Sequence, residues 1–160
     1  MDTDDLSAGV PTSVPAGVPA GYVMRATKEF ATHAGPFYAP PDGDMIGCGF
    51  LAGAKHGNKR GVVHGGMLAT AFDVALGNAS WHAASQKPCA TVQLNVHFIG
   101  AVKLGDFAFV RVEVTKATRT MVFLRGVMVV AGQDGADRVV ATADGVWKIL
   151  DWRGEPFKPT

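Results

Sequence analysis

Residues 57–80 have the sequence GNKRGVVHGGMLATAFDVALGNAS, and this stretch decides how the rest of the chain can be arranged. From Gly65 to about Ala84 it has the length of a helix and contains mostly good helix formers, with no proline until Pro88. Apolar residues occur on nearly every side, which is typical of a buried helix. The segment contains one acidic residue, Asp73, which has no cation three or four positions away.

After this helix the pattern changes to a period of two. Residues 91–98 alternate polar and apolar side chains, as in a half-buried strand, and further β-rich segments cover 106–116, 121–132 and 137–150. The connections are too short for parallel crossovers, so we expect these four strands to form an antiparallel meander. One buried helix with such a sheet predicts an α+β fold, in which an antiparallel sheet wraps around one long central helix.

The N-terminal part is expected to contribute less. Residues 1–21 are rich in Pro, Gly and Ala and are interpreted as a flexible or loosely draped arm, while 22–160 form a single domain. Within that domain, residues 22–35 have roughly helical spacing that ends at Gly35. Residues 45–53 are expected to form a first strand, weakened by its glycines.

Composition excludes several classes of function. The chain has 160 residues, of which 48% are hydrophobic and 18% charged, so it is globular, and its net charge of +1 does not favour nucleic acid as a partner. Its two cysteines, Cys48 and Cys89, form neither a disulfide framework nor a zinc cluster. There is no apolar run long enough for a membrane span and no secretory signal, so a cytoplasmic protein is expected.

The start of the helix suggests an anion site. His64, Gly65 and Gly66 stand where Ser, Thr, Asp or Asn would normally cap the first N–H groups, so free donors are expected there. Such donors carry partial positive charge and suit an oxyanion or a polarised carbonyl. A plain turn is the simpler explanation of these three residues.

Asp73 suggests an acid or base, because a buried carboxylate without a partner is costly or has a raised pKa. An Asp that faces solvent is the simpler explanation. Asp73 lies eight residues beyond Gly65, about 12 Å along a helix, which is too far for both to act on one carbonyl. Either the two features are unrelated, or the donors and the carboxylate come from different chains of a two-fold dimer.

The spacing of these residues resembles that of the PaaI-like hotdog-fold acyl-CoA thioesterases. That family has an Asn six residues before the His of an HGG motif and an Asp nine residues after that His, which match Asn58, 64–66 and Asp73 here. A Ser or Thr opens the following strand, and Thr91 occupies that position in ATVQLNVHFIG, residues 90–100. The resemblance covers residues from about Gly35 to Leu150 and implies a hotdog fold.

The resemblance implies a role for each catalytic candidate. The Gly65 N–H would polarise the thioester carbonyl, while Asn58 and His64 would shape that end of the site. Asp73 of the partner subunit would activate a water or attack the carbonyl directly, and Thr91 would hold the water or the intermediate. The implied reaction is hydrolysis of an acyl-CoA to a free acid and coenzyme A.

The loops GAVKLGD (100–106) and KATRTMVF (116–123) resemble the coenzyme A-binding segments of the family. The expected substrate-binding residues are Gly66, Lys103, Lys116, Arg119 and Thr120. The family needs no metal or redox cofactor, and its members form homodimers that often pair into homotetramers.

Two other functions compete with hydrolysis: a hotdog hydratase or dehydratase acting on acyl-CoA, and a non-catalytic acyl-CoA-binding module. The acyl group cannot be identified from the pattern. The side chains considered for its pocket are Met45, Met67, Phe72 and Trp81.

Overall fold

The structure is a computed structural model that describes residues 14–25, 27–41, 47–131 and 135–151. The described residues form ten elements. In chain order these are β1 (Val23–Met24), α1 (Glu29–Ala34), β2 (Tyr38–Ala39), β3 (Cys48–Leu51), the 3-10 helix η1 (Ala54–His56), α2 (Gly65–Ala83), β4 (Cys89–Phe98), β5 (Phe107–Ala117), β6 (Met121–Ala131) and β7 (Asp137–Ile149). None of the helices in these ranges is long and apolar enough to cross a membrane.

The strands form one antiparallel sheet in the order β1-β2-β3-β5-β6-β7-β4. The four long strands are therefore antiparallel, as expected, but the prediction of a simple meander is wrong, because β4 pairs with β7 and not with β5. Residues 99–106 carry the chain from β4 across the end of the sheet to β5. Eight residues can span about 26 Å, more than the roughly 14 Å across three strand spacings.

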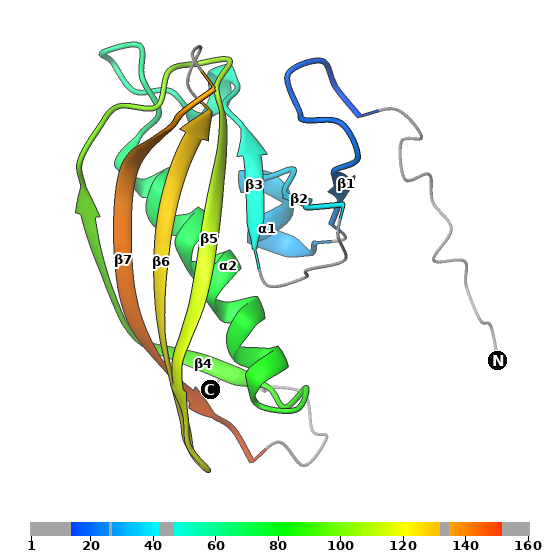
Figure 1. The fold of residues 1–160 in the computed structure, drawn as a ribbon, viewed down its shortest axis with the longest axis vertical. Helices are drawn as coiled ribbons and strands as arrows, with labels where there is room; N and C mark the ends of the chain where they lie inside the picture. Colours follow the sequence, from blue (N-terminus) through cyan, green and yellow to red (C-terminus); the bar gives the residue numbers. More distant parts are fainter. Residues whose placement is uncertain (1–13, 26, 42–46, 132–134, 152–160) are drawn as a thin grey trace, which may run out of the picture.

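Helix α2 lies in the concave face of this sheet, as the sequence predicted (Figure 1). Phe72 and Leu76 of α2 are fully buried, and Trp147 of β7 is buried in the same core. Gly126 of β6 lets the helix approach closely, since a Cβ at this position would lie 3.0 Å from two ring carbons of Phe72. Packing of a long helix into a curved sheet confirms the predicted α+β architecture.

One face of α2 is open to solvent, so the expectation of a helix buried on all sides is wrong for a single chain. The buried face consists of Met67, Leu68, Ala71, Phe72, Ala75, Leu76, Ala79 and Ser80. The opposite face contains exposed Asp73 and half-buried Thr70 and Gly77. Its small residues cannot be distinguished from core residues by periodicity, which explains the error.

The segment before the sheet differs from the expected helix over 22–35. Val23–Met24 forms a short strand at the sheet edge, and the helix covers only Glu29–Ala34. Residues 14–21 are largely exposed and contain turns. After them, Tyr22 packs edge-on against Phe107 and Phe109 of β5. Residues 1–13, the rest of the predicted arm, lie outside the described residues.

Candidate active site

The start of α2 has one free backbone donor. The expectation of an uncapped helix is wrong, because His64 is the N-cap residue and its Nδ1 accepts a hydrogen bond of 2.9 Å from the Gly66 N–H. A histidine ring nitrogen can replace the usual Ser or Asp oxygen here because His64 has extended backbone geometry. The Gly65 N–H makes no hydrogen bond with the residues that the structure describes. It is the donor left for a ligand.

Asn58 belongs to the loop that delivers His64. Its side-chain oxygen accepts a 2.8 Å hydrogen bond from the Arg60 N–H, and its own N–H donates to the Val62 carbonyl at 2.8 Å. The loop is closed at its base by a 2.7 Å bond from the His64 N–H to the His56 carbonyl. Asn58 and His64 line one cavity of about 710 Å³, so the structure brings these two predicted residues together.

Asp73 and Thr91 form the second part of the site. The Thr91 hydroxyl donates a hydrogen bond of 2.8 Å to Asp73 Oδ1, and this contact joins α2 to β4. The prediction of a buried carboxylate without a partner is wrong, since Asp73 is exposed in the single chain. It makes no ion pair with the described residues. The carboxylate is therefore held by one hydrogen bond and open to a ligand.

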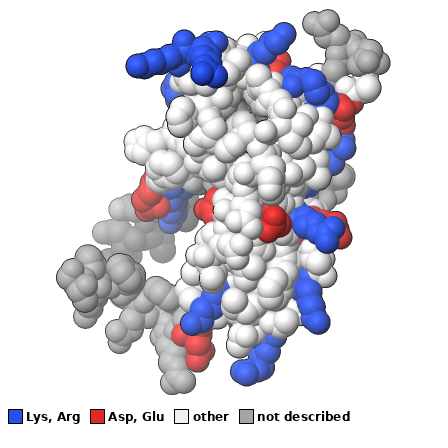
Figure 2. All heavy atoms as spheres, turned by 90° about the vertical axis from the view of Figure 1, so that its left-hand side faces the viewer, with Lys and Arg blue, Asp and Glu red and all other residues white. Residues whose placement is uncertain are grey.

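The two parts of the site lie on one continuous helix, which begins at Gly65 and passes through Asp73. Their separation along the helix is about 12 Å. Strand β4, next to Asp73, is the edge of the sheet, and its Val92 and Phe98 are 58% and 57% exposed. Figure 2 views this side and shows a broad surface with few charges, with Lys and Arg gathered mainly near its ends.

Two cavities connect these parts along α2. One, of about 480 Å³, borders Asp73 and Thr70 and is also lined by α1 and β4. The other, of about 630 Å³, borders His64, Gly66 and Thr70 and is lined by η1 and α1 as well. Thr70 lines both, so the cavities adjoin one another on the open face of α2.

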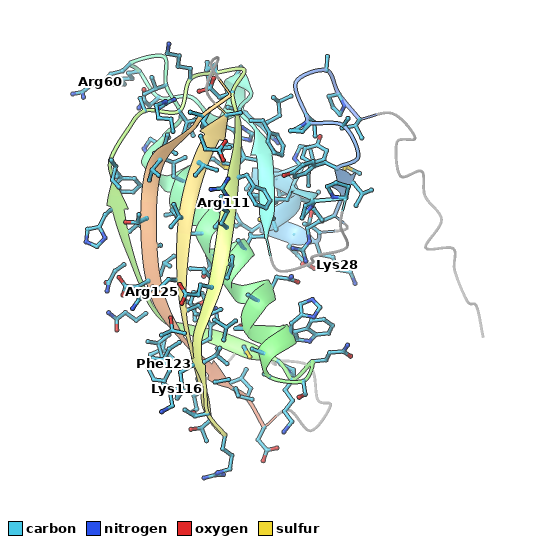
Figure 3. The ribbon with its side chains drawn as sticks, viewed as in Figure 1. Lys28, Arg60, Arg111, Lys116, Phe123 and Arg125 are labelled. Carbon is cyan, nitrogen blue, oxygen red and sulfur yellow. The ribbon has the colours of Figure 1, made fainter. Side chains whose placement is uncertain are left out.

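The expected coenzyme A-binding residues fall into two groups within one chain. Lys103 lies beside the His64 loop, since it bridges to Val62, and its N–H donates to Asp106. Lys116 lies at the other end of β5, where Figure 3 shows it far from Arg60. Arg119 and Thr120 follow it in the turn to β6 and line a cavity of about 450 Å³. The structure therefore does not join Lys103 to the other cations.

Several residues of these cavities were missed from sequence. Lys87 lines the Arg119 cavity, and Lys28 and Phe30 line the Asp73 cavity. In sequence, Lys87 is far from Arg119, and Lys28 and Phe30 are far from Asp73, so no local pattern connects them. Knowledge of which strand pairs with β7, and of where α1 packs, would have been needed to find them.

His56 connects the site to α1. Its Nδ1 accepts a 3.0 Å hydrogen bond from the Gly53 N–H, and its Nε2 lies 2.8 Å from the Ala34 carbonyl, so the ring is neutral with the proton on Nε2. Burial lowers the pKa of His56, and Lys55 lowers it further, while the bond to Ala34 acts in the opposite direction. This histidine therefore stabilises the contact between η1 and α1, and it is poorly suited to act as a base.

The described residues contain no group of three His, Cys, Asp or Glu side chains that could hold a metal ion. Cys48 and Cys89 are free. Burial raises the pKa of the Cys48 thiol to about 12, so this thiol is a poor nucleophile. Among the catalytic candidates, the Gly65 N–H and the Asp73 carboxylate are open to a ligand.

The long helix in an antiparallel sheet is the hotdog fold, and comparison with known proteins identifies the class of this protein. Residues 60–136 match the thioesterase superfamily. The chain is 32% identical over 117 residues to PA0474 of Pseudomonas aeruginosa, which is named as an esterase, covering 72% of this chain and 84% of that protein. The chain belongs to the thioesterase superfamily and is a thioester hydrolase.

Solved structures agree with the hotdog fold. HI0827, a hexameric broad specificity acyl-coenzyme A thioesterase, superposes with a TM-score of 0.61 at 20% identity, over 67% of this chain and 80% of that one. The PaaI protein of Escherichia coli superposes with a TM-score of 0.57 at 18% identity, over 71% and 72% of the two chains. At these identities the likeness concerns the fold.

Proposed function

We propose that the protein is an acyl-CoA thioesterase whose catalytic site combines two copies of the chain. The Gly65 N–H of one copy and the positive end of its helix α2 polarise the thioester carbonyl. Asp73 of the second copy supplies the base or the nucleophile, and Thr91 of that copy orients the carboxylate. Asn58 and His64 shape the carbonyl end of the site, where His64 also holds the Gly66 N–H.

The observation that carries this proposal is the pair of Asp73 and Thr91 on an open helix face. The 2.8 Å bond aims the carboxylate while leaving it exposed, and the free Gly65 donor lies about 12 Å away along the same helix. A two-fold pairing through the exposed edge strand β4 sets two α2 helices antiparallel. It would thus place each Asp73 near the Gly65 of the other copy.

The chemistry needs only water and the thioester. In the base route, Asp73 takes a proton from water, the hydroxide adds to the carbonyl carbon, and the oxyanion forms at the Gly65 N–H. When the C–S bond breaks, the sulfur leaves as coenzyme A thiolate and takes up a proton. In the nucleophile route, Asp73 attacks the carbonyl carbon and the C–S bond breaks, which releases coenzyme A thiolate and leaves a mixed anhydride that water then hydrolyses to the free acid and the carboxylate of Asp73. Neither route requires a metal or redox cofactor.

The same pairing suggests how coenzyme A is bound. An antiparallel dimer brings the Lys103 end of one copy towards the Lys116, Arg119 and Thr120 end of the other. Phosphate groups attract such cations, so one bound coenzyme A would use both groups. The proposed assembly is a homodimer, paired into a dimer of dimers, and sedimentation or native mass spectrometry tests it against a hexamer such as HI0827 forms.

The proposed location is the cytoplasm, where free cysteines such as Cys48 and Cys89 stay reduced. The substrate is a small molecule, and neither nucleic acid nor a membrane is proposed as a partner. The net charge of +1 agrees with this.

The test of this function is thiol release from acyl-CoA, followed with a thiol reagent, in the wild type and two variants. Asp73→Asn and Asp73→Ala should lower kcat by roughly 10²- to 10⁴-fold, the usual contribution of a general base. Both should fold normally, because Asp73 is exposed. A fully active Asp73→Ala enzyme contradicts the mechanism. Hydration of an enoyl-CoA without thiol release, or tight binding without turnover, would instead identify a hydratase or a binding module.

A further inference from the structure

Three elements line the cavity beside Asp73. Helix α2 contributes Ala69 and Val74, strand β4 contributes Leu94, and α1 contributes further residues. It adjoins the cavity at His64, because Phe30 and Thr70 line both. We name the cavity beside Asp73, of about 480 Å³, the acyl groove.

We propose that the acyl groove binds the acyl part of the thioester, that this acyl group is apolar, uncharged and longer than acetyl, and that Phe30 sets the preference for chain length. This inference rests on the thioesterase function proposed above. It adds the class of acyl group and a specificity-determining residue on α1.

The side chains of the groove fit an apolar ligand. Ala69, Val74 and Leu94 are half-buried, and Phe30 is 69% exposed, the largest exposure among the large hydrophobic side chains that the structure describes. Covering such surface is favourable by about 25 cal/mol per Å². An acyl group whose carbonyl lies at Asp73 has these apolar side chains as its nearest surroundings.

The charges of the groove disfavour an acyl group that ends in a carboxylate. Lys28 contributes one positive charge, whereas Glu29 and Asp73 contribute two negative charges, so the sum for these three is −1. A carboxylate at the end of an acyl group would be repelled by this net negative charge. Among the described residues, no other Lys or Arg lines the cavity. Figure 3 shows Lys28 beside α1, well away from Lys116.

The backbone at the start of α1 is unusual at the residue before Phe30. Glu29 has a φ of +46°, which residues other than glycine rarely adopt and which costs energy. Strained residues cluster at active sites and ligand-binding positions. Both Glu29 and Phe30, which follows it in the first turn of α1, line the groove.

The structure also revises which side chains are candidates for the acyl pocket. Phe72 is fully buried in the core and cannot contact a ligand, and Met67 lines the cavity at His64 but not the acyl groove. Trp81 lies two turns beyond Asp73, makes an edge-on contact with His82 and lines neither cavity. Met45 lies outside the described residues. Phe30, Val74 and Leu94 replace these candidates.

The experiment compares chain-length preference in three proteins. We measure kcat/KM for acetyl-, butyryl-, hexanoyl- and succinyl-CoA with the wild type, Phe30→Ala, and Phe123→Ala as a matched control. Phe123 is also an exposed phenylalanine, but it lies on β6 beside Lys116 in the sheet register (Figure 3). In the wild type, kcat/KM should rise about four-fold per added methylene and fall for succinyl-CoA.

Phe30→Ala should lower the ratio of hexanoyl- to acetyl-CoA kcat/KM by about ten-fold, because the longer acyl chain loses the exposed aromatic surface that it would cover. Phe123→Ala should leave that ratio unchanged, and Phe30→Leu should restore part of it. An equal loss for both substrates in Phe30→Ala, or a preference for succinyl-CoA, overturns the proposal.

Binding separates this proposal from the proposed hydrolysis. S-hexyl-CoA is a thioether that cannot be hydrolysed, so its Kd relative to that of coenzyme A reports on the groove even in an inactive protein. We expect S-hexyl-CoA to bind at least ten-fold more tightly than coenzyme A to the wild type, with most of this gain lost in Phe30→Ala. Equal affinities in the wild type contradict the groove, whereas absent turnover with intact binding contradicts only the hydrolysis.

Discussion

The single residues of the candidate site differ in whether a hydrogen-bond partner within the chain already holds them. Asp73 is held by Thr91, and Gly66 by His64, so of the groups predicted for catalysis the Gly65 N–H remains the free donor. The family resemblance predicted that Thr91 lies beside Asp73, and the hydrogen bond between these two side chains agrees with this placement. It could not predict that a histidine would cap α2, because imidazole nitrogen is not among the usual capping groups.

His56 provides a prediction at this scale. Its pKa is lowered in the folded protein, so the unfolded chain binds more protons below the ordinary value of about 6.5. The stabilisation from neutral His56 is therefore full above that pH and is lost as pH falls towards the lowered pKa. Urea unfolding between pH 5 and 8 should give a steeper loss of stability for the wild type than for His56→Gln. If the free energy of unfolding changed with pH in the same way for both proteins, the lowered pKa of His56 would be contradicted.

Among the elements, α2 was predictable from its helix formers and from the absence of proline before Pro88, and the four long strands from their alternating or β-rich sequences. The order of the strands was not. The loop 99–106 is long enough either to return to a neighbour or to cross the sheet end, and the sequence does not distinguish the two. The helix predicted over residues 22–35 is longer than α1, because the strand β1 has only two residues and is too short to show an alternating pattern.

The contact between α2 and β6 gives a prediction for this scale. Gly126→Ala would place a Cβ 3.0 Å from the ring of Phe72, which is fully buried and cannot move away freely. We expect a loss of about 1–3 kcal/mol in the free energy of unfolding, as for other overpacked cores. Gly53→Ala is the control, because nothing lies within 4 Å of a Cβ there. Equal stability of the two variants would show that the sheet adjusts without cost.

In the whole molecule, a single chain leaves one side of the candidate site open to solvent. The exposed carboxylate of Asp73 is hydrogen-bonded to Thr91 of β4, the edge strand that also carries the exposed side chains of Val92 and Phe98. In the sequence, only the distance from Gly65 to Asp73 indicated that a second chain is needed to complete the proposed site. Which end of one copy meets which end of the other depends on a pairing that no single-chain pattern encodes.

A hybrid dimer tests whether two chains share one catalytic site. One chain carries Gly65→Pro, which removes the N–H at the first helical position, where proline is tolerated after the extended His64. The other chain carries Asp73→Ala. Gly65→Ala, which keeps the N–H, is the control for the added Cβ near the exposed ring of Phe98.

Each homodimer should be inactive, whereas the hybrid, purified through two different tags and verified by native mass spectrometry, keeps one intact site of two. The account predicts a thiol-release rate for the hybrid of about half that of the wild-type dimer. An inactive hybrid would contradict it, since that result means Gly65 and Asp73 act within one chain.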